Sequence, residues 1–215
     1  MATLDELRSA THGEWGGASP DGATRCTGVS TDSRTLAAGE VFVALRGPHF
    51  DGHDYVASAA RRGAVAAVVE RRSVEAPGLP LLVVPDALAA LGAFARAMRA
   101  AARGPVVGIT GSVGKTTTKE MTAALLATRG PVLKTEGNRN NHIGLPLTLA
   151  RLGPEHTAAV VEMGMSAAGE IAHLAAIARP DVAVITNVAP VHLESFAALD
   201  EIAHAKAEIL AGLAP

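Results

Sequence analysis

Short apolar segments alternate with longer segments rich in alanine along most of this chain, and that alternation restricts the folds available to it. The apolar segments have the length of buried strands, and the longer ones have the length of helices. Strands separated by helices pair in parallel through right-handed crossover connections. The sequence therefore predicts an α/β protein. We expect strands at residues 41–45, 65–69, 81–84, 106–110, 158–161 and 182–186, and helices at residues 55–62, 87–102, 115–128, 167–178 and 199–213.

Composition narrows the class of protein further. Of 215 residues, 48% are apolar and 19% are charged, which excludes a disordered chain. A net charge of −2 offers no basic surface for nucleic acid, and no uncharged apolar run is long enough to cross a membrane. Cys26 is the single cysteine, which excludes a disulfide framework and a multi-cysteine metal cluster. The N-terminal segment lacks the apolar core of a secretory signal, so we expect a soluble, monomeric protein of the cytoplasm.

The best candidate for a domain boundary follows the predicted helix at residues 87–102. Asp86 is expected to cap the start of that helix, and an Arg-Gly-Pro sequence at residues 103–105 interrupts it. A second series of strands and helices begins directly afterwards. We therefore expect two domains, at residues 1–103 and 104–215.

The strongest local motif lies between the strand at 106–110 and the helix at 115–128. Its glycines allow backbone N–H groups to face a phosphate at the positive end of the helix. Lys115 would neutralise β- and γ-phosphate charge, and the Thr116 hydroxyl would bind Mg²⁺. The spacing is the shorter G-x-x-G-K-T form of a phosphate-binding loop, and the alternative is a plain glycine-rich turn. The predicted ATP-binding residues are Gly111, Ser112, Val113, Gly114, Lys115, Thr116 and Thr117.

Polar residues also follow the next two strands of this series. Glu162 ends one apolar strand, and Thr186-Asn187 end the next, with His192 shortly after. The carboxyl ends of parallel strands meet at one edge of a sheet, where ligands bind. A carboxylate beside a phosphate-binding loop suits a Mg²⁺–nucleotide site. The alternatives are a solvated strand end for Glu162 and an ordinary surface residue for His192.

The predicted helix at 199–213 places a lysine among apolar residues. Lys206 lies four residues after Ile202 and three before Ile209, which puts it on the inward face of the helix. Burial lowers the pKa of a lysine and makes its amine nucleophilic. The alternative is a lysine at the edge of the apolar stripe, with its ammonium group in water. The stripe itself consists of Leu199, Ile202, Ala203, Ile209 and Leu213.

An asparagine-rich loop covers residues 135–141. Three of its last four residues are Asn, and so many donors and acceptors suit the recognition of a polar substrate. The alternative is a set of turn-forming and capping residues, a role that Asn commonly takes.

In their order along the chain, these motifs resemble those of the Mur ligase family. The matching segments of the second half are 110–117, 137–146, 162–164, 169–171, 186–188, 192–194 and the region around Ala205-Lys206. In the first half, Asp32-Ser-Arg34, the segment 42–47 and Phe50-Asp-Gly-His53 resemble the uridine-nucleotide domain of that family. Ser112 and Ala189-Pro190 depart from the commoner pattern, but neither change removes a charged group. The resemblance implies a small uridine-nucleotide-binding α/β domain followed by a parallel-sheet ATPase domain with a phosphate-binding loop.

The resemblance also implies a reaction. ATP would phosphorylate the terminal carboxylate of a nucleotide-linked peptide, and an incoming amine would displace the phosphate to form an amide in peptidoglycan precursor synthesis. The Asn-Asn-x-Ile-Gly-Leu-Pro and Glu-Met-Gly sequences favour the type whose substrates are UDP-N-acetylmuramoyl-tripeptide and D-alanyl-D-alanine. A sister ligase that adds a single amino acid is the alternative enzyme. A UDP-substrate-binding module without catalysis is the alternative of another class.

Residue roles follow from the same resemblance. Lys115 and the loop amides would hold the β- and γ-phosphates, and Thr116 and Glu162 would bind a first Mg²⁺. His192 would help to bind a second ion. In the family, the lysine that matches Lys206 carries a CO₂-derived carbamate, which makes it a carboxylate-like anion near Mg²⁺. Lys115, Lys206 and His192 are thus the predicted catalytic residues.

The substrate contacts implied by the resemblance lie in both halves of the chain. Asn138 and Asn141 would contact the nucleotide-sugar substrate, and Ser33 and Arg34 would lie near its uridine end. Members of the family are much longer than this chain. We therefore expect a truncated form that ends inside the ATPase domain and does not catalyse the reaction alone.

Overall fold

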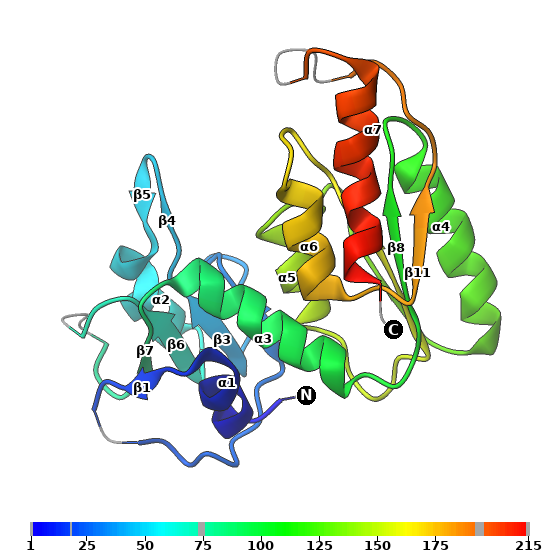
Figure 1. Cartoon of the computed structure of the whole chain (residues 1–215). Coiled ribbons are helices and arrows are strands. Elements are labelled where there is room, and N and C mark those ends of the chain that lie inside the picture. The colour runs from blue at the N-terminus through cyan, green and yellow to red at the C-terminus, as the bar shows by residue number, and fades with distance from the viewer. Residues whose placement is uncertain (1, 18, 73–75, 192–195, 214–215) are drawn as a thin grey trace. The chain divides into compact units, whose positions relative to one another are not determined.

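The computed structural model describes residues 2–17, 19–72, 76–191 and 196–213. The chain divides into two units, residues 1–94 and residues 95–215. The division lies within helix α3 (Ala87–Ala101), which is one continuous helix in Figure 1. The boundary expected from the sequence, between residues 103 and 104, lies shortly after the end of this helix.

The main sheet of the first unit contains β1 (Glu14–Trp15), β2 (Gly28–Ser30), β3 (Glu40–Val43), β6 (Ala66–Val69) and β7 (Leu81–Val83). Its strand order is β1-β7-β6-β3-β2. Strands β2, β3, β6 and β7 pair in parallel, as the alternation predicted. Strand β1 pairs antiparallel with β7, and β4 (Arg46–Gly47) and β5 (Phe50–Asp51) form a separate antiparallel hairpin.

Three short elements accompany this sheet: α1 (Leu4–Thr11), the 3-10 turn η1 (Gly52–Tyr55) and α2 (Val56–Arg61). A capping box formed by Thr3 and Glu6 starts α1. Gly63, with φ of +90°, follows α2 in the left-handed conformation that ends helices. The cap predicted for α3 is confirmed, because the Ala89 N–H donates to Asp86 Oδ1 at 2.8 Å.

The sheet of the second unit is parallel throughout and has the order β11-β8-β10-β9. Its strands are β8 (Val106–Thr110), β9 (Val132–Lys134), β10 (Ala158–Glu162) and β11 (Val182–Ile185). Its helices are α4 (Lys115–Leu126), α5 (Gly144–Leu149), α6 (Glu170–Ala178) and α7 (Leu199–Ala207), with the 3-10 turns η2 (Ala127–Arg129) and η3 (Glu208–Gly212). In the register of the sheet, Glu162 lies opposite Ile109, and Ile185 lies opposite Thr110. The carboxyl ends of β8, β10 and β11 therefore meet at one edge.

Helices cover both faces of this sheet. Ile109 and Val160 pack with Ala123 of α4 on one face. Val106 and Val161 point to the other face, where they belong to a core formed with α5, α6 and α7. Figure 1 shows α4 on one side of β8 and α6 and α7 on the other. Two-sided burial explains why these strands are continuous apolar runs rather than alternating ones.

The predicted strands and helices are present, but several short elements had no sequence signal. Strand β9 has only three residues, and α5 contains Pro146 in its first turn, where a missing N–H is tolerated. The expected helix at 199–213 is α7 followed by η3, and the ends of its stripe, Leu199 and Leu213, are exposed. Over the described residues, the structure contains no helix with the length and apolar character needed to span a membrane.

Candidate active site

The glycine-rich loop joins β8 to α4 in a conformation that requires glycine. Gly111 and Gly114 have φ of +144° and +83°, and α4 begins at Lys115. A Cβ atom at Gly111 would clash with the Thr186 side chain. The first-turn amides of α4 have no partner within the helix, so they are available to an anion.

The segment after β11 holds this loop in place. The Ser112 N–H donates to Asn187 O at 3.0 Å, and the Val113 N–H donates to Asn187 Oδ1 at 2.9 Å. The Thr186 hydroxyl donates to Val113 O at 2.6 Å, and Ser112 Oγ donates to Ala189 O at 3.0 Å. Two of the predicted ATP-binding amides are thus engaged within the protein. For the amides of residues 114–117, the described residues provide no such partner, which leaves these amides available to an anion.

Lys115 and Thr116, the first two residues of α4, have different hydrogen-bond partners. Lys115 Nζ donates to Gly111 O at 2.8 Å, so its ammonium group lies over the loop. The Thr116 hydroxyl donates to Glu162 Oε2 at 3.0 Å. The structure therefore brings together the loop, Thr116 and Glu162.

Glu162 is not a solvated strand end, since only 3% of the residue is exposed. Asn140 Nδ2 donates to Glu162 Oε1 at 3.0 Å, while Thr116 occupies the other carboxylate oxygen. Among the described residues, no cationic side chain forms a salt bridge with Glu162. A buried carboxylate without a cationic partner is costly.

This donor set fits Mg²⁺. Glu162 and Thr116 offer a carboxylate and a hydroxyl oxygen, the hard ligands that the ion prefers. The described part of the chain contains no group of three His, Cys, Asp or Glu residues that could hold a metal. Protein sites for Mg²⁺ often supply one or two oxygens and leave the rest to phosphates and water.

Lys206 lies inward on α7, as its position in the helical period predicted. Only 2% of the residue is exposed. Burial, and after it the positive charge of Lys115, lower the pKa of Lys206 to about 8. In the described part of the chain, Lys206 takes part in no salt bridge. Its amine is therefore neutral over much of the mildly alkaline range. The predicted His192 lies outside the described residues.

The asparagine-rich loop divides its residues between structure and site. Asn141 Oδ1 accepts from the N–H groups of Ile143 and Gly144 at 3.1 and 2.9 Å, which caps α5. Asn138 is exposed, and its carbonyl accepts from the Asn140 N–H at 2.8 Å. Asn140, which the sequence analysis did not single out, is the member of the loop that contacts Glu162.

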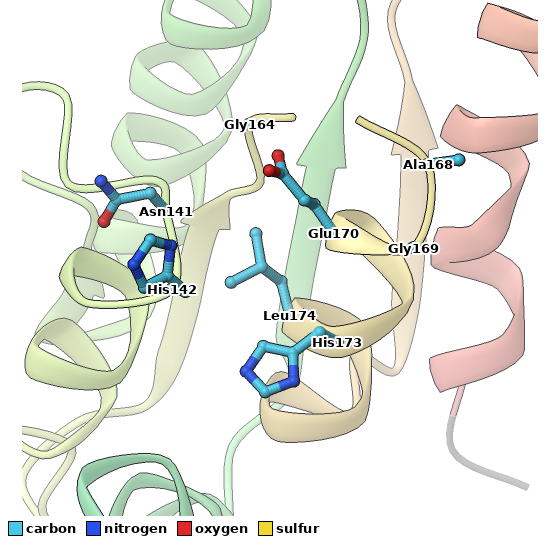
Figure 2. Close-up of a pocket in the computed structure, with 8 residues that line it drawn as sticks. All are labelled: Asn141, His142, Gly164, Ala168, Gly169, Glu170, His173 and Leu174. Carbon is cyan, nitrogen blue, oxygen red and sulfur yellow. The ribbon is translucent and has the colours of Figure 1, made fainter. Parts of the chain in front are cut away.

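A cavity of about 230 Å³ lies beside this loop. Figure 2 shows Asn141 and His142 on one side and Glu170 and His173 of α6 on the other, with Leu174 between them. Ser166 N–H donates to Glu170 Oε2 at 2.6 Å and thereby fixes that carboxylate at the start of α6. The cavity is lined by both polar and apolar side chains.

The first unit has a separate cavity of about 430 Å³. Its lining residues are Thr31, Asp32, Ser33, Arg34, Phe42, Phe50, Gly52 and Tyr55. Both predicted uridine contacts, Ser33 and Arg34, are among them. Hydrogen bonds from the Arg34 side chain and backbone lower the pKa of Asp32 to about 2. Phe50 and Tyr55 are about half exposed, which leaves aromatic faces available to a planar ligand.

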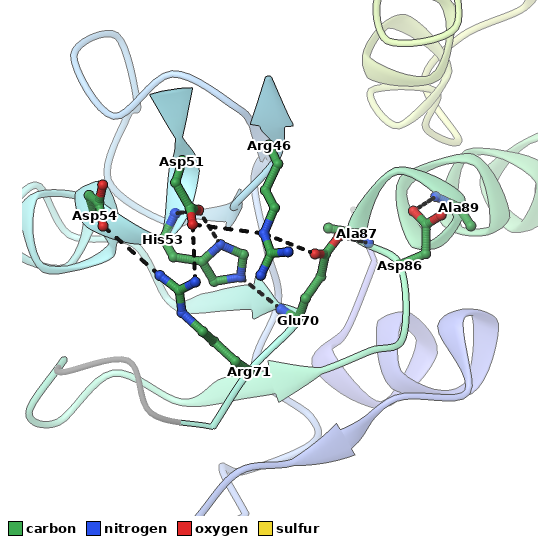
Figure 3. Close-up of polar contacts among 9 residues, drawn as sticks. All are labelled: Arg46, Asp51, His53, Asp54, Glu70, Arg71, Asp86, Ala87 and Ala89. Atoms are coloured by element: carbon green, nitrogen blue, oxygen red, sulfur yellow. Dashed lines mark hydrogen bonds and ion pairs between the residues drawn. The ribbon is translucent and has the colours of Figure 1, made fainter. Parts of the chain in front are cut away.

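Figure 3 shows a polar cluster in the same unit, in which Asp51 and His53 flank the cavity residue Gly52 along the chain. We call it the His53 cluster; it comprises Arg46, Asp51, His53, Glu70 and Arg71. His53 is buried, its Nδ1 lies 2.5 Å from Asp51 Oδ1, and its Nε2 accepts from the Glu70 N–H at 2.9 Å. Because the Glu70 N–H can only donate, Nε2 must be the accepting nitrogen of the ring, and Nδ1 carries the ring proton. Asp51 and His53 thus alternate along the chain with the cavity residues Phe50 and Gly52.

Comparison with known proteins places both units in one family. The family profile "Mur ligase family, catalytic domain" matches residues 25–99, and the profile "Mur ligase middle domain" matches residues 109–215. The chain belongs to the Mur ligase family.

Individual members of the family agree with this assignment. The chain is 44% identical over 211 residues to UDP-N-acetylmuramoyl-tripeptide--D-alanyl-D-alanine ligase of Escherichia coli K12, covering 98% of the chain and 45% of that protein. It is 49% identical over 189 residues to the ligase of the same name from Bacillus subtilis 168, covering 86% and 41%. The chain thus spans less than half the length of these curated relatives.

Solved structures of family members give the same picture. A crystal structure of MurF from Acinetobacter baumannii matches with a TM-score of 0.91 at 39% identity, covering 100% of this chain and 47% of that one. MurF ligase from Thermotoga maritima, solved in complex with ADP, matches with a TM-score of 0.77 at 41% identity, covering 88% and 44%. The α/β fold predicted from the sequence is therefore confirmed for this family member.

Proposed function

We propose that this chain forms the UDP-substrate-binding and ATP-binding parts of an ATP-dependent amide ligase of peptidoglycan precursor synthesis. The enzyme adds D-alanyl-D-alanine to UDP-N-acetylmuramoyl-tripeptide, the activity named for the relatives above. Residues 1–103 bind the uridine end and residues 104–215 bind ATP. The observation that carries the proposal is the pair of Thr116 and Glu162, 3.0 Å apart beside the glycine-rich loop. We also propose a monomeric, cytoplasmic enzyme.

The residues of the second unit serve the first step. The amides of residues 114–117 and Lys115 bind the β- and γ-phosphates of ATP, and Thr116 and Glu162 hold Mg²⁺. When bound, the ion neutralises phosphate charge. The terminal carboxylate oxygen of the tripeptide then attacks the γ-phosphorus, ADP leaves, and an acyl phosphate remains. The protein contributes mainly positioning and electrostatic stabilisation to this step.

The second step forms the amide. The amino group of D-alanyl-D-alanine attacks the acyl carbon, inorganic phosphate leaves, and the amine loses a proton. Asn138 and Asn141 orient the nucleotide-sugar substrate for this attack, while Ser33 and Arg34 hold the uridine end. Phe50 and Tyr55, which line the same cavity, add stacking contacts.

Lys206 has a proposed role as a modified residue. A neutral lysine amine adds to CO₂ and loses a proton, which gives a carbamate. Burial and a pKa of about 8 support this role, since the neutral form of the amine is then populated at mildly alkaline pH. The carbamate would replace a buried cation by an anion, and together with His192 it would serve a second Mg²⁺.

Two measurements test the proposal. The protein encoded by the complete reading frame that contains this chain should release ADP and phosphate when it is given UDP-N-acetylmuramoyl-tripeptide, D-alanyl-D-alanine and Mg·ATP. It should show far lower turnover with the dipeptide nucleotide and a diamino acid. In calorimetric titrations, the 215-residue chain should bind Mg·ATP, and Lys115→Ala should lose that binding. Binding of the UDP-linked substrate without any binding of Mg·ATP would instead favour the non-catalytic module.

A further inference from the structure

We propose that Lys119 is a positioning residue that fixes Glu162 and the asparagine-rich loop relative to the glycine-rich loop. The inference deepens the proposed function and rests on it. It concerns a set of residues that we call the Glu162 cluster: Thr116, Lys119, Thr135, Asn140 and Glu162.

Lys119 is almost completely buried on the helix that starts with the glycine-rich loop. It lies one turn after Thr116, and only 1% of the residue is exposed. Its Nζ donates to the backbone carbonyl of Thr135 at 2.8 Å and lies 3.1 Å from Glu120 Oε1. An ammonium group is costly to bury, and nothing in the proposed chemistry uses this one directly. The burial of this ammonium group therefore needs an explanation, and its contacts provide one.

Thr135 passes this contact on to Glu162. Thr135 follows β9, is fully buried, and its N–H donates to Val160 O at 3.1 Å. The Glu162 N–H donates to Thr135 Oγ1 at 2.9 Å. One residue is thus bonded to α4 through its carbonyl and to the end of β10 through its hydroxyl and amide. Lys119 holds the residue that aligns the backbone of Glu162.

The chain returns to the same carboxylate five residues later. Asn140 Nδ2 donates to Glu162 Oε1, and the Gly164 N–H donates to Asn140 O at 2.9 Å. Thr116 bonds to Glu162 Oε2, so each carboxylate oxygen has one partner among the residues that the structure describes. The contacts form a closed ring from α4 through Thr135 and Asn140 to Glu162 and back to α4. A shift at Lys119 must therefore move the substrate loop and the metal ligand together.

The chain also supplies a matched control. Lys134 forms an ion pair with Glu120, the same acid that Lys119 contacts, but its side chain is 43% exposed. Lys134→Met removes a lysine and its salt bridge, and it keeps the bonds that Thr135 forms with Lys119 and Glu162. Lys119→Met makes the same change of side chain at the lysine that belongs to the ring of contacts.

The experiment measures binding of Mg·ATP and of UDP-N-acetylmuramoyl-tripeptide to the 215-residue chain by calorimetry, well below the melting temperature of each variant. Lys119→Met should weaken both by about tenfold, the size of effect seen for groups that orient metal ligands, and Lys134→Met should stay within about twofold of wild type. Lys119→Met should also raise the Mg²⁺ concentration that is needed for half-saturation with nucleotide. A purely structural lysine would lower the melting temperature and leave these affinities unchanged.

A second pair of variants keeps the test decisive if Lys119→Met does not fold. Thr135→Ser retains the hydroxyl group that receives the Glu162 N–H, and Thr135→Val removes it. The valine variant alone should show the loss of both affinities. Wild-type affinity for both ligands in a folded Lys119→Met or Thr135→Val chain would overturn the inference. Failure of the wild-type chain to bind either ligand would overturn the proposed function instead. Hydrogen exchange at residues 136–142, faster in Lys119→Met than in Lys134→Met, would then still report on positioning.

Discussion

The two units each contain a polar cluster around a carboxylate, and the two clusters balance charge in different ways. In the His53 cluster, Asp51 and Glu70 have arginine partners, and their side chains are 29% and 19% exposed. In the Glu162 cluster, the carboxylate is buried, and within the described part of the chain its bonding partners are the Thr116 hydroxyl and the Asn140 side-chain amide. A carboxylate already paired with arginine has little to offer a cation. Within the described part of the chain, Glu162 has no arginine or lysine partner that would compete with a bound cation.

The hydrogen bonds around the two carboxylates make the same distinction. The backbone and side chain of His53, ahead of Arg71, lower the pKa of Asp51 to about 2. That cluster joins η1 and the β4–β5 hairpin to the end of β6, and through Glu70 to the Ala87 N–H at the start of α3. We interpret the His53 cluster as a brace, that is, a set of bonds that stabilises the fold next to the cavity of the first unit. We propose that the Glu162 cluster, by contrast, belongs to the ATP-binding site.

The largest expected effect separates the two clusters by ligand binding. Glu162→Gln keeps the shape of the side chain and removes its charge, so Mg·ATP affinity should fall by about 100-fold. Asp51→Asn, the matched change in the His53 cluster, should leave that affinity unchanged. Titration calorimetry of both variants makes the comparison. Equal effects of the two substitutions would show that the clusters do not differ in this way.

The next effect concerns stability. His53→Ala leaves the part-buried Glu70 N–H without its partner and removes the ring contact to Asp51 Oδ1, which should cost about 2 kcal/mol of unfolding free energy. Urea denaturation measures this loss. The Mg·ATP affinity of the folded variant should remain that of wild type. The interpretation of this cluster as a brace fails if nucleotide binding is lost while the unfolding free energy is unchanged.

A smaller effect depends on alkaline pH. The pKa of Lys206 is about 8 in the folded chain and near its ordinary value of 10.5 in the unfolded chain. Between these values the unfolded state binds more protons, so stability should rise with pH, by about 1 kcal/mol or more. Denaturation in CO₂-free buffer at pH 7.5 and pH 10 tests this. Lys206→Met should abolish the rise, and an equal rise in that variant would assign it to another group.

The smallest effect lies at the acid end and belongs to the other cluster. Asp51 has a folded pKa of about 2, below its ordinary value of 3.8, so its contribution is complete above pH 4 and is lost as the pH falls through 2. Partial exposure of the side chain keeps the effect small. Exchange protection of the Glu70 amide, followed from pH 4.5 to 2.5, should decline in wild type. Asp51→Asn should show low protection throughout.

The sequence was informative where a feature repeats along the chain. The strand–helix alternation predicted the parallel sheets, and the helical period placed Lys206 inward. The glycine spacing predicted the loop at 111–117, because left-handed backbone conformations require glycine there. Each of these signals is local.

Other parts of the site had no local signal. Asn140 could not be distinguished from Asn138 or Asn141, because only the return of the loop past β10 brings it to Glu162. Lys119 lies in a polar stretch of α4, and its buried ammonium group bonds to Thr135, which follows β9 and is distant from α4 in the sequence. The strands β1, β4 and β5 have two residues each, too few for a period to be recognised. These features arise from tertiary contacts.

The hold of Asn187 on the glycine-rich loop has a consequence for how the protein folds. The bonds from Asn187, Thr186 and Ala189 reach back over 73 to 77 residues to the loop. Contacts of such sequence separation form late, after the entropy of loop closure has been overcome. During synthesis, α4 and its glycines leave the ribosome long before the segment that locks them. The glycine-rich loop therefore reaches its final conformation only when β11 has docked against β8.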